Sequence, residues 1–403
     1  MSTTSKPYSY KLHAYTFGAK TKAKYLPERN LPSRSRGEHP TYTANYSISR
    51  AVVRELRVRF PAAVMVAGGP HASALPEEVA EDFDFVVVGE GENEFVRLLR
   101  LIERNSTEPP PRILRAAPIE DLDRLPFPDF RRFCDLDTYT RRIGTRPVIC
   151  VDSSRGCDHR CRFCNSRVVE RGRWRARSAE SVASELRWHV DQGSRAFRFN
   201  DDNFLALCDR ASEICEYIQS LGTDLVFRIF ARAESLCDRK LCDKLVAAGC
   251  RHVGVGIESL SKKMLKMMGK AATIEQMLCG VKTAHQAGMQ IRGFFIVGFP
   301  GETEGTIAET LAQLEHLPLD EAVAYPCVPY PGTDLFARPA DYGITWMDPD
   351  FSQYIQVGRD RSAGFVLRTG SFGPDEVRAW RQRYMDAFTI LGMAWSDERG
   401  DVR

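Results

Sequence analysis

Three cysteines near the middle of the chain constrain its fold and chemistry more than any other feature of the sequence. Cys157, Cys161 and Cys164 are spaced C-x3-C-x2-C on a predicted loop, after an apolar strand at 147–152 and a turn at 153–156. Three thiolates on one short loop can converge on a cubic iron–sulfur cluster, whose complete ligand set is four cysteines. The next cysteine is Cys208, beyond a predicted helix, so one iron of such a cluster would stay open to another ligand.

A structural zinc site and metal-free buried thiols are the other interpretations of this triplet. Structural zinc sites usually join a C-x2-C pair to a second Cys/His pair. His159 lies between the cysteines at a spacing that suits no familiar zinc finger, and no second pair follows. The spacing, with Phe163 directly before the last cysteine, resembles the signature of the radical S-adenosylmethionine (SAM) superfamily.

The resemblance implies a [4Fe-4S] cluster on the three cysteines and SAM on the open iron. In that family the amino and carboxylate groups of SAM bind this iron, and an electron from the cluster cleaves the sulfonium C–S bond. The 5′-deoxyadenosyl radical so formed abstracts a hydrogen atom from the substrate. The polypeptide orients the reactants and excludes water and oxygen, because the difficult chemistry belongs to the cofactors.

The composition is that of a globular protein with no overall electrostatic preference for nucleic acid. Of the 403 residues, 43% are hydrophobic and 27% charged, and the net charge is +3. No apolar signal region follows Met1 and no run of 18 apolar residues occurs, which predicts a cytoplasmic protein without a membrane span. In a reducing compartment clustered cysteines indicate metal more often than disulfides.

From residue 146 a strand–loop–helix pattern repeats about six times. Strands are predicted at 147–152, 195–200, 225–231, 251–257, 290–298 and 321–328, and helices at 178–192, 206–221, 238–249, 273–288 and 302–316. The repeat predicts an α/β fold with a partial (β/α)6 TIM-like barrel over residues 146–335. In such barrels the functional side chains gather at the carboxyl ends of the strands.

A partial Rossmann-like α/β unit is predicted over residues 46–105, from helices at 47–59, from Pro76 onward and at 94–104, and strands at 62–67 and 84–88. Its segments GGPHAS (68–73) and DFVVVGEGE (84–92) resemble the second half of the cobalamin-binding domain of a large radical SAM subfamily. The lower-ligand motif D-x-H-x-x-G of that domain has no match before Gly68, which predicts a truncated or degenerate B12-binding-like domain. Cobalamin binding is left open, because a tight turn at Gly68 and Gly69 needs no ligand.

Three further segments complete the predicted organisation. Residues 1–45 are basic and carry no assignable fold, and residues 106–145 form a proline-rich connector. Residues 336–403 form a C-terminal extension, with a helix near 374–392, that covers the open side of the barrel.

Polar residues after the second and third strands are candidates for binding SAM. The resemblance places an acidic motif after the second strand, where it accepts hydrogen bonds from the SAM ammonium. Asp201 is the first candidate, followed by Asp202 and Asn203, and an N-cap for the next helix is the alternative role. Arg232 stands with Glu234 after the third strand, where it can pair with the SAM carboxylate or form a surface salt bridge.

The later strand ends supply the remaining candidates. Glu258 and Ser259 resemble the family's ribose-contacting motif and suit a diol, although Ser259 can instead cap a short helix at 261–268. Gly298 would let the backbone approach the adenine. Cys327 shares a strand face with Tyr325 and is a candidate hydrogen-atom donor to a product radical, with a buried thiol as the alternative.

The leading functional hypothesis is a radical SAM enzyme that abstracts hydrogen from a small natural-product or sugar-like biosynthetic substrate. Its net reaction would be dehydration, dehydrogenation, epimerisation or rearrangement. A cobalamin-dependent radical SAM C-methyltransferase is the alternative, and a non-catalytic partner protein with the same fold is the third hypothesis. Both enzyme hypotheses require an electron donor such as flavodoxin or ferredoxin.

Overall fold

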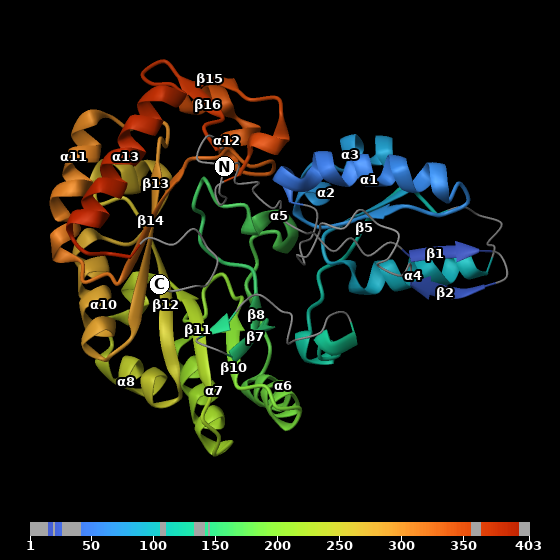
Figure 1. Ribbon diagram of the computed structural model, residues 1–403, viewed down its shortest axis with the longest axis horizontal. Helices are drawn as coiled ribbons and strands as arrows, with labels where there is room; N and C mark the ends of the chain where they lie inside the picture. Colours follow the sequence, from blue (N-terminus) through green and yellow to red (C-terminus); the bar gives the residue numbers. More distant parts are fainter. Residues whose placement is uncertain are drawn as a thin grey trace, which may run out of the picture.

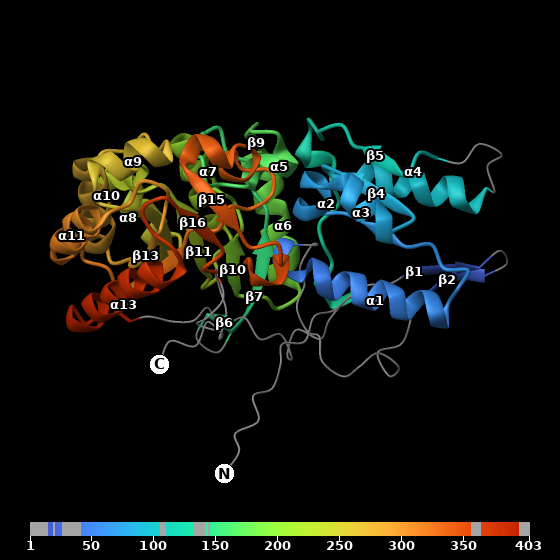
Figure 2. The same cartoon turned by 90° about the horizontal axis from the view of Figure 1, so that it is seen from above.

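The computed structural model describes residues 15–18, 21–25, 42–104, 110–132, 142–143, 146–355 and 364–394. They form a larger lobe around a curved sheet and a smaller lobe with its own three-stranded sheet (Figure 1). The lobes lie side by side (Figure 2), and α2 (Pro70–Ala74) of the smaller lobe contacts α5 (Ser166–Glu170) of the larger one. Within these residues no helix has the length and apolar composition that a bilayer span requires.

The larger lobe is an incomplete barrel. Its strands follow the order β14-β13-β12-β11-β10-β7-β6, and all neighbours are parallel except β6 and β7. They are β6 (Arg142–Ile143), β7 (Arg146–Val151), β10 (Ala196–Phe199), β11 (Val226–Ala231), β12 (Cys250–Glu258), β13 (Gln290–Val297) and β14 (Glu321–Pro326). The outer helices are α6 (Ala179–Asp191), α7 (Cys208–Ser220), α8 (Arg239–Ala247), α10 (Ile274–Gln286) and α11 (Glu304–Gln313). The predicted partial barrel is confirmed.

Short elements lie between the strands and these helices. They are the antiparallel pair β8 (Ser154–Arg155) and β9 (Arg175–Ala176), and η6 (Ala233–Leu236), α9 (Lys262–Met268) and η7 (Leu314–His316). The β8–β9 pair, which the sequence analysis does not predict, closes the base of the cysteine loop.

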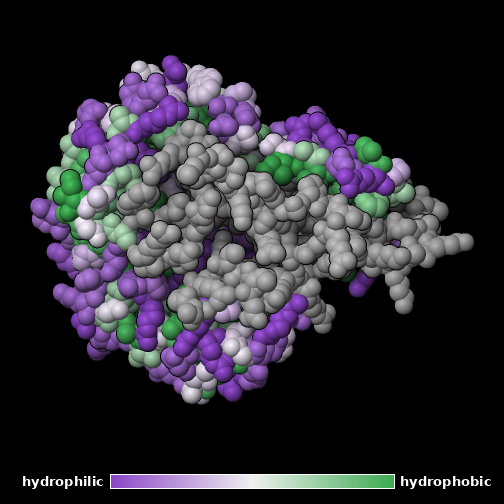
Figure 3. Space-filling model, viewed as in Figure 1, coloured by the Kyte–Doolittle hydropathy of each residue, from purple (hydrophilic) through white to green (hydrophobic). Residues whose placement is uncertain are grey.

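Alternation along the strands separates an apolar outer face from a mixed inner face. Phe197 and Phe199 on β10 and Phe227 on β11 are buried in the main core with the helices. The intervening Arg198 faces the other way, with its guanidinium carbon 4.9 Å from the centre of the Phe230 ring. Because the helices bury their apolar sides on the sheet, the visible outer face of this lobe is mostly hydrophilic (Figure 3).

The smaller lobe is a parallel sheet with helices packed on it. Its strands β3 (Val66–Ala67), β4 (Phe85–Val88) and β5 (Ile113–Arg115) run in the order β3-β4-β5. The helices are α1 (Tyr46–Arg59), α2, α3 (Pro76–Asp82) and α4 (Gly91–Glu103). Val53 and Leu56 of α1 pack against Val86 in its core. A proline opens both α2 and α3, a position where the missing N–H would have no helical partner.

The strand predicted at 62–67 is too long, because β3 contains only Val66 and Ala67. The Asp84 carboxylate accepts a hydrogen bond from the Met65 backbone N–H at 2.7 Å, and the Asp84 N–H donates to the Met65 carbonyl. These two bonds satisfy Met65 without a neighbouring strand, so regular pairing starts one residue later.

Much of the predicted N-terminal segment and connector lies outside the described residues. The described parts are the antiparallel pair β1 (Tyr15–Gly18) and β2 (Thr21–Tyr25), the short helices η2 (Thr43–Asn45), η3 (Leu122–Arg124) and η4 (Phe130–Arg132), and the strands β5 and β6 already placed in the two sheets. The boundaries of these two segments therefore remain predictions.

The C-terminal extension contacts both lobes. It contains α12 (Asp334–Ala337), η8 (Pro339–Tyr342), β15 (Ile344–Met347), η9 (Phe351–Gln353), β16 (Leu367–Thr369) and α13 (Pro374–Ile390). Tyr384 and Phe388 of α13 pack on Phe295 of β13, so the predicted helix near 374–392 is present and lies on the outer face of the sheet. Phe351 of η9 reaches the smaller lobe, where its ring centre lies 5.1 Å from that of His71.

Candidate active site

The three cysteines lie on the loop between β8 and β9, at the carboxyl end of the sheet. Cys157 and Cys164 are each close enough to Cys161 for their charges to interact. Burial raises the pKa of Cys157, and it raises that of Cys164 to about 11 despite a 3.2 Å contact between its Sγ and the Ser166 hydroxyl. Thiols in such surroundings become thiolates readily only beside a strong positive charge such as a metal.

The donor set of this loop fits an iron–sulfur cluster. A cubic cluster takes each cysteine on a different iron, so its ligands need not converge on one point. Among the described residues, no three Cys, His, Asp or Glu side chains are gathered for a single metal ion. The loop's shape depends on Gly156, whose φ is +80°: a Cβ there would lie 2.1 Å from the Arg173 carbonyl oxygen.

Asp201 and Asp202 follow β10 and point in different directions. Both oxygens of the buried Asp201 carboxylate are occupied at the base of the cysteine loop, accepting from the Ser153 N–H (2.8 Å) and from the Ser153 and Ser154 hydroxyls (2.6 and 2.5 Å). Asp202 is exposed, and its charge acts on Cys157 and Cys164. The structure therefore brings Asp202, rather than the first candidate Asp201, to the cysteines.

The surroundings of Asp202 determine the pKa of its carboxyl group. It is open to solvent but deep in the barrel mouth, where partial desolvation, Asp201 and Asp152 raise its pKa to about 6. Asn203 is buried, and its Oδ1 accepts from the Arg232 N–H at 3.3 Å. Asn203 thus joins the ends of β10 and β11.

Arg232 lies on the cysteine side of the barrel mouth. Its guanidinium pairs with Glu234 and is within hydrogen-bonding reach of Cys161. Arg232 and Lys270 also lie close enough to His159 on the cysteine loop to add to the lowering of its pKa that burial begins. Arg232 and Lys270 therefore flank the cysteine loop, and Lys270 was not among the site residues predicted from the sequence.

Lys270 belongs to a buried ion pair at the end of β12. Its Nζ lies 3.4 Å from Glu258 Oε1, and both side chains are largely buried. Glu258 has a left-handed backbone, with φ of +64°, which is a strained conformation typical of functional sites. Gly256 makes room for the pair, because a Cβ there would lie 2.3 Å from Glu258 Oε1. In the sequence, a glycine inside a predicted strand was the feature that could have indicated this close approach of a side chain to the backbone.

Ser259 and Gly298 are both placed inside the protein. The Ser259 hydroxyl is fully buried, 3.1 Å from the Thr310 hydroxyl, and accepts from the Ser261 N–H. Gly298 has φ of +81°, and a Cβ there would lie 2.7 Å from a Val377 methyl group. Its N–H donates to Glu302, whose burial raises the carboxyl pKa to about 8. The predicted SAM contacts of Ser259 and Gly298 stay predictions.

An aromatic wall lies below the mouth on the inner face of the sheet. Phe230 and Phe294 have ring centres 6.0 Å apart, and Phe294 stacks on Tyr325 at 6.2 Å and 14°. Gly254 leaves space for this wall, since a Cβ there would lie within 3 Å of both phenylalanine rings. Cys327 is buried in the main core, where burial and the nearby Glu302 raise its pKa. Its role as hydrogen-atom donor stays a prediction.

The carboxyl ends of β3 and β4 lie at one edge of the smaller sheet. A Cβ built on Gly68 or Gly91 would make only an ordinary contact with Val87, at 3.7 or 3.8 Å, so neither glycine is tightly packed. Ligands of open parallel sheets bind at this edge. His71 is buried beside it, with Nδ1 3.2 Å from the Thr43 hydroxyl, and desolvation lowers its pKa to about 4. The residues present fit a ligand at this edge, and none of them reproduces D-x-H-x-x-G.

Comparison with known proteins identifies the class that this fold and site define. Residues 151–314 match the model of the radical SAM superfamily, and the chain belongs to that superfamily, whose cofactors are a [4Fe-4S] cluster and SAM. Residues 40–99 match the B12 binding domain, which places the chain among the members that carry this domain.

Several relatives are methyltransferases. An uncharacterized methyltransferase of Pyrococcus horikoshii is 32% identical over 292 residues, which are 68% of this chain and 62% of the relative. The cytidylyl-2-hydroxyethylphosphonate methyltransferase of Streptomyces wedmorensis is 25% identical over 79% of this chain and 67% of the relative. The chain thus spans about six tenths of the length of the first of these proteins.

Solved structures share the fold at low identity. The radical SAM methyltransferase TsrM of Kitasatospora setae, with cobalamin and a [4Fe-4S] cluster bound, has a TM-score of 0.63 at 19% identity, over 87% of this chain and 78% of that chain. The cobalamin-dependent radical SAM enzyme OxsB with aqua-cobalamin bound has a TM-score of 0.59 at 17% identity, over 90% of this chain and 54% of that chain. These likenesses concern the fold alone.

Proposed function

We propose that the chain is a cobalamin-dependent radical SAM methyltransferase that acts on a small molecule. One observation carries the proposal: the loop at the carboxyl end of β4 in the B12-binding unit touches the base of the cysteine loop, with Glu90 Oε1 2.7 Å from Arg155 Nη1. A corrin at the carboxyl edge of the smaller sheet would therefore face the cluster. The identities of the relatives favour this alternative over hydrogen abstraction as the complete reaction.

The roles of the residues follow from their positions. Cys157, Cys161 and Cys164 would hold the cluster, which supplies single electrons, while cobalamin supplies a carrier for a methyl group. Asp202 would accept hydrogen bonds from the SAM ammonium and Arg232 would pair with its carboxylate. The pair formed by Glu258 and Lys270 would orient the SAM ribose through the Glu258 carboxylate.

The aromatic wall is the proposed substrate surface. Phe230, Phe294 and Tyr325 offer ring faces to a substrate at the mouth, and Gly254 lets the two phenylalanine rings pack close over the sheet. A small electron-transfer protein such as a flavodoxin or ferredoxin would supply the electrons.

Cofactor content tests the proposal directly. Protein reconstituted anaerobically with iron, sulfide and hydroxocobalamin should retain a corrinoid absorbance after gel filtration. With SAM and a reductant it should form S-adenosylhomocysteine, the product expected when SAM donates a methyl group. A preparation with full iron content but no retained corrinoid, which yields only 5′-deoxyadenosine, would refute it.

Hydrogen abstraction without methyl transfer is the second candidate function. The missing D-x-H-x-x-G motif favours it, because that motif would supply the lower cobalt ligand. Deuterium transfer from a labelled substrate into 5′-deoxyadenosine, in protein that lacks corrinoid, would support this candidate.

A further inference from the structure

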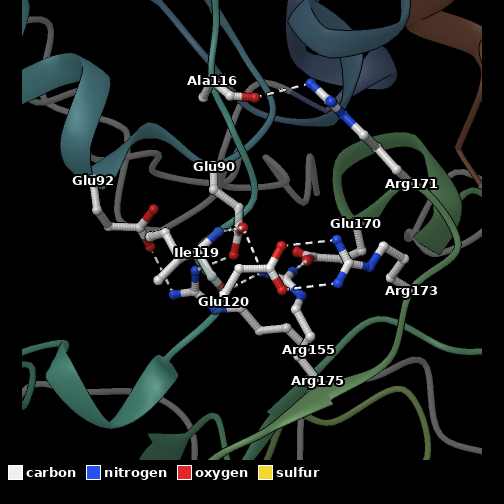
Figure 4. A network of polar contacts seen from close by, with 10 residues as sticks. All are labelled: Glu90, Glu92, Ala116, Ile119, Glu120, Arg155, Glu170, Arg171, Arg173 and Arg175. Carbon is white, nitrogen blue, oxygen red and sulfur yellow. Dashed lines mark hydrogen bonds and ion pairs between the residues drawn. The ribbon is translucent and has the colours of Figure 1, made fainter.

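A buried carboxylate lies on the border between the two lobes. Glu90 follows β4 in the B12-binding unit, and its side chain is 2% exposed. It accepts hydrogen bonds from Arg155 Nη1 (2.7 Å), Arg175 Nη1 (2.7 Å) and the Ile119 N–H (2.6 Å), so both of its oxygens are used (Figure 4). Glu90 is thus shared between its own lobe, the connector and the radical SAM domain.

The two arginines held by Glu90 mark the beginning and the end of the cysteine loop. Arg155 on β8 is the partner of Arg175 on β9 in the register of the antiparallel pair. The residues between them, 156–174, include all three cysteines. Glu92 holds the second Nη of Arg155 at 2.6 Å, and Glu170 pairs with Arg175. A carboxylate of the smaller lobe therefore fixes the closed base of this loop.

A second buried carboxylate holds the same base from the barrel. Asp201 accepts from the backbone and hydroxyl of Ser153 and from the hydroxyl of Ser154, directly before Arg155. The base of the loop is thus fixed from two sides by carboxylates of different lobes. Removal of either one should loosen the loop without touching a cysteine.

Electrostatics makes the Glu90 contact stronger than the others on this border. Burial alone would raise the pKa of Glu90, but hydrogen bonds from Arg175, Arg155 and the Ile119 N–H outweigh it, so the pKa is lowered. Arg175 is itself only 6% exposed and needs a charged partner. By contrast, Glu120 and Arg173 form a two-pronged pair at 2.8 Å that is exposed, and exposed pairs contribute little.

We infer that Glu90 is a positioning residue that makes the geometry of the cluster loop depend on the docked B12-binding unit. By clamping Arg155 and Arg175, it transmits the position of the smaller lobe to the loop that carries the cluster ligands. This inference rests on the superfamily and its cluster, and it holds whether or not the enzyme transfers a methyl group.

The test compares E90Q with E120Q in full-length protein reconstituted anaerobically with iron and sulfide. Glutamine keeps the size of Glu90, but it is uncharged and cannot accept hydrogen bonds from both arginines through a carboxylate. Hydrogen exchange of residues 156–174 should become at least about tenfold faster in E90Q, as expected for the loss of one charge-assisted hydrogen bond. The EPR spectrum of the reduced, SAM-bound cluster should change as well, at unchanged iron content. E120Q should match the parent in both measurements.

Clear outcomes would overturn the inference. Parent-like exchange and an unchanged EPR spectrum in E90Q would show that the clamp does not position the loop. If E90Q did not accumulate as folded protein, R155K would replace it, because lysine keeps the charge but cannot hold Glu90 and Glu92 together. A smaller change in the same direction is then expected, and parent-like behaviour of R155K would refute the proposal.

Discussion

The two adjacent aspartates after β10 should separate stability from SAM binding. Asp202 faces the cysteines and is exposed, whereas Asp201 is buried with three hydrogen-bond donors. The substitutions D202N and D201N each replace a carboxyl group by an amide, with almost no change in size. D202N should nevertheless be defective in SAM binding, and D201N in stability.

D202N should weaken SAM binding without lowering the stability of the fold. A hydrogen bond between a carboxylate and an ammonium group in a partly desolvated site contributes about 2 kcal/mol, which corresponds to about a thirtyfold change in dissociation constant. Since the pKa of Asp202 is about 6, the parent should also bind SAM more weakly below pH 6, as the carboxylate becomes protonated and loses its charge. D202N should lose that pH dependence. Equilibrium dialysis of radiolabelled SAM on the reconstituted protein measures both effects.

D201N should lower stability instead. The amide nitrogen replaces an oxygen that accepts hydrogen bonds from the Ser153 and Ser154 hydroxyls. The free energy of unfolding should therefore fall by roughly 2–3 kcal/mol. Thermal unfolding followed by circular dichroism should show the loss, while SAM affinity per folded cluster stays near that of the parent. The reasoning would be refuted if D201N weakened SAM binding at unchanged stability while D202N bound SAM normally.

Three further tests use substitutions in other parts of the structure. C161S should abolish iron incorporation measured by absorbance and metal analysis, whereas C208S, at an exposed cysteine, should retain it. The pKa of His71 is lowered from 6.5 to about 4, so its folding contribution is present above pH 6.5 and is lost as pH falls toward 4. Between pH 8 and 5 the parent should lose about 2 kcal/mol more than H71F in urea unfolding, and equal losses would contradict the burial argument. G298A should destabilise the protein by about 1–3 kcal/mol, and V377A should restore only the steric share of that loss, because the left-handed backbone at Gly298 remains.

Local patterns were enough to predict the barrel. The strands and helices after residue 146 follow from apolar runs separated by amphipathic segments, and these are properties of neighbouring residues. The predicted start of β3 was wrong for a non-local reason, since the Asp84 side chain, 19 residues away, satisfies the Met65 N–H. The cysteine spacing identified the cluster loop because all three ligands lie within eight residues.

The orientation of site residues depends on contacts that no local pattern contains. Asp201 turns away from the cysteines because its partners lie 48 and 47 residues earlier, at Ser153 and Ser154. Glu90 meets Arg155 across 65 positions of the chain. Lys270 lies only 12 residues from Glu258, but the pairing depends on the strained backbone at Glu258 and on the short helix between them. Sequence therefore identifies which strand end carries a role more readily than which side chain fulfils it.

The contact of η9 with the smaller lobe affects how ligands can reach the site. A proline-rich tether alone would allow the two lobes to swing apart, but the Glu90 clamp and Phe351, which lies beside His71 and packs on Tyr354, attach them at two further places. Attachment at separated points resists hinge rotation of one lobe against the other. Exchange of a bulky ligand therefore depends on small local displacements where the two lobes meet. Deletion of the Phe351 ring would remove one of these attachments and ease small displacements of the lobes against each other.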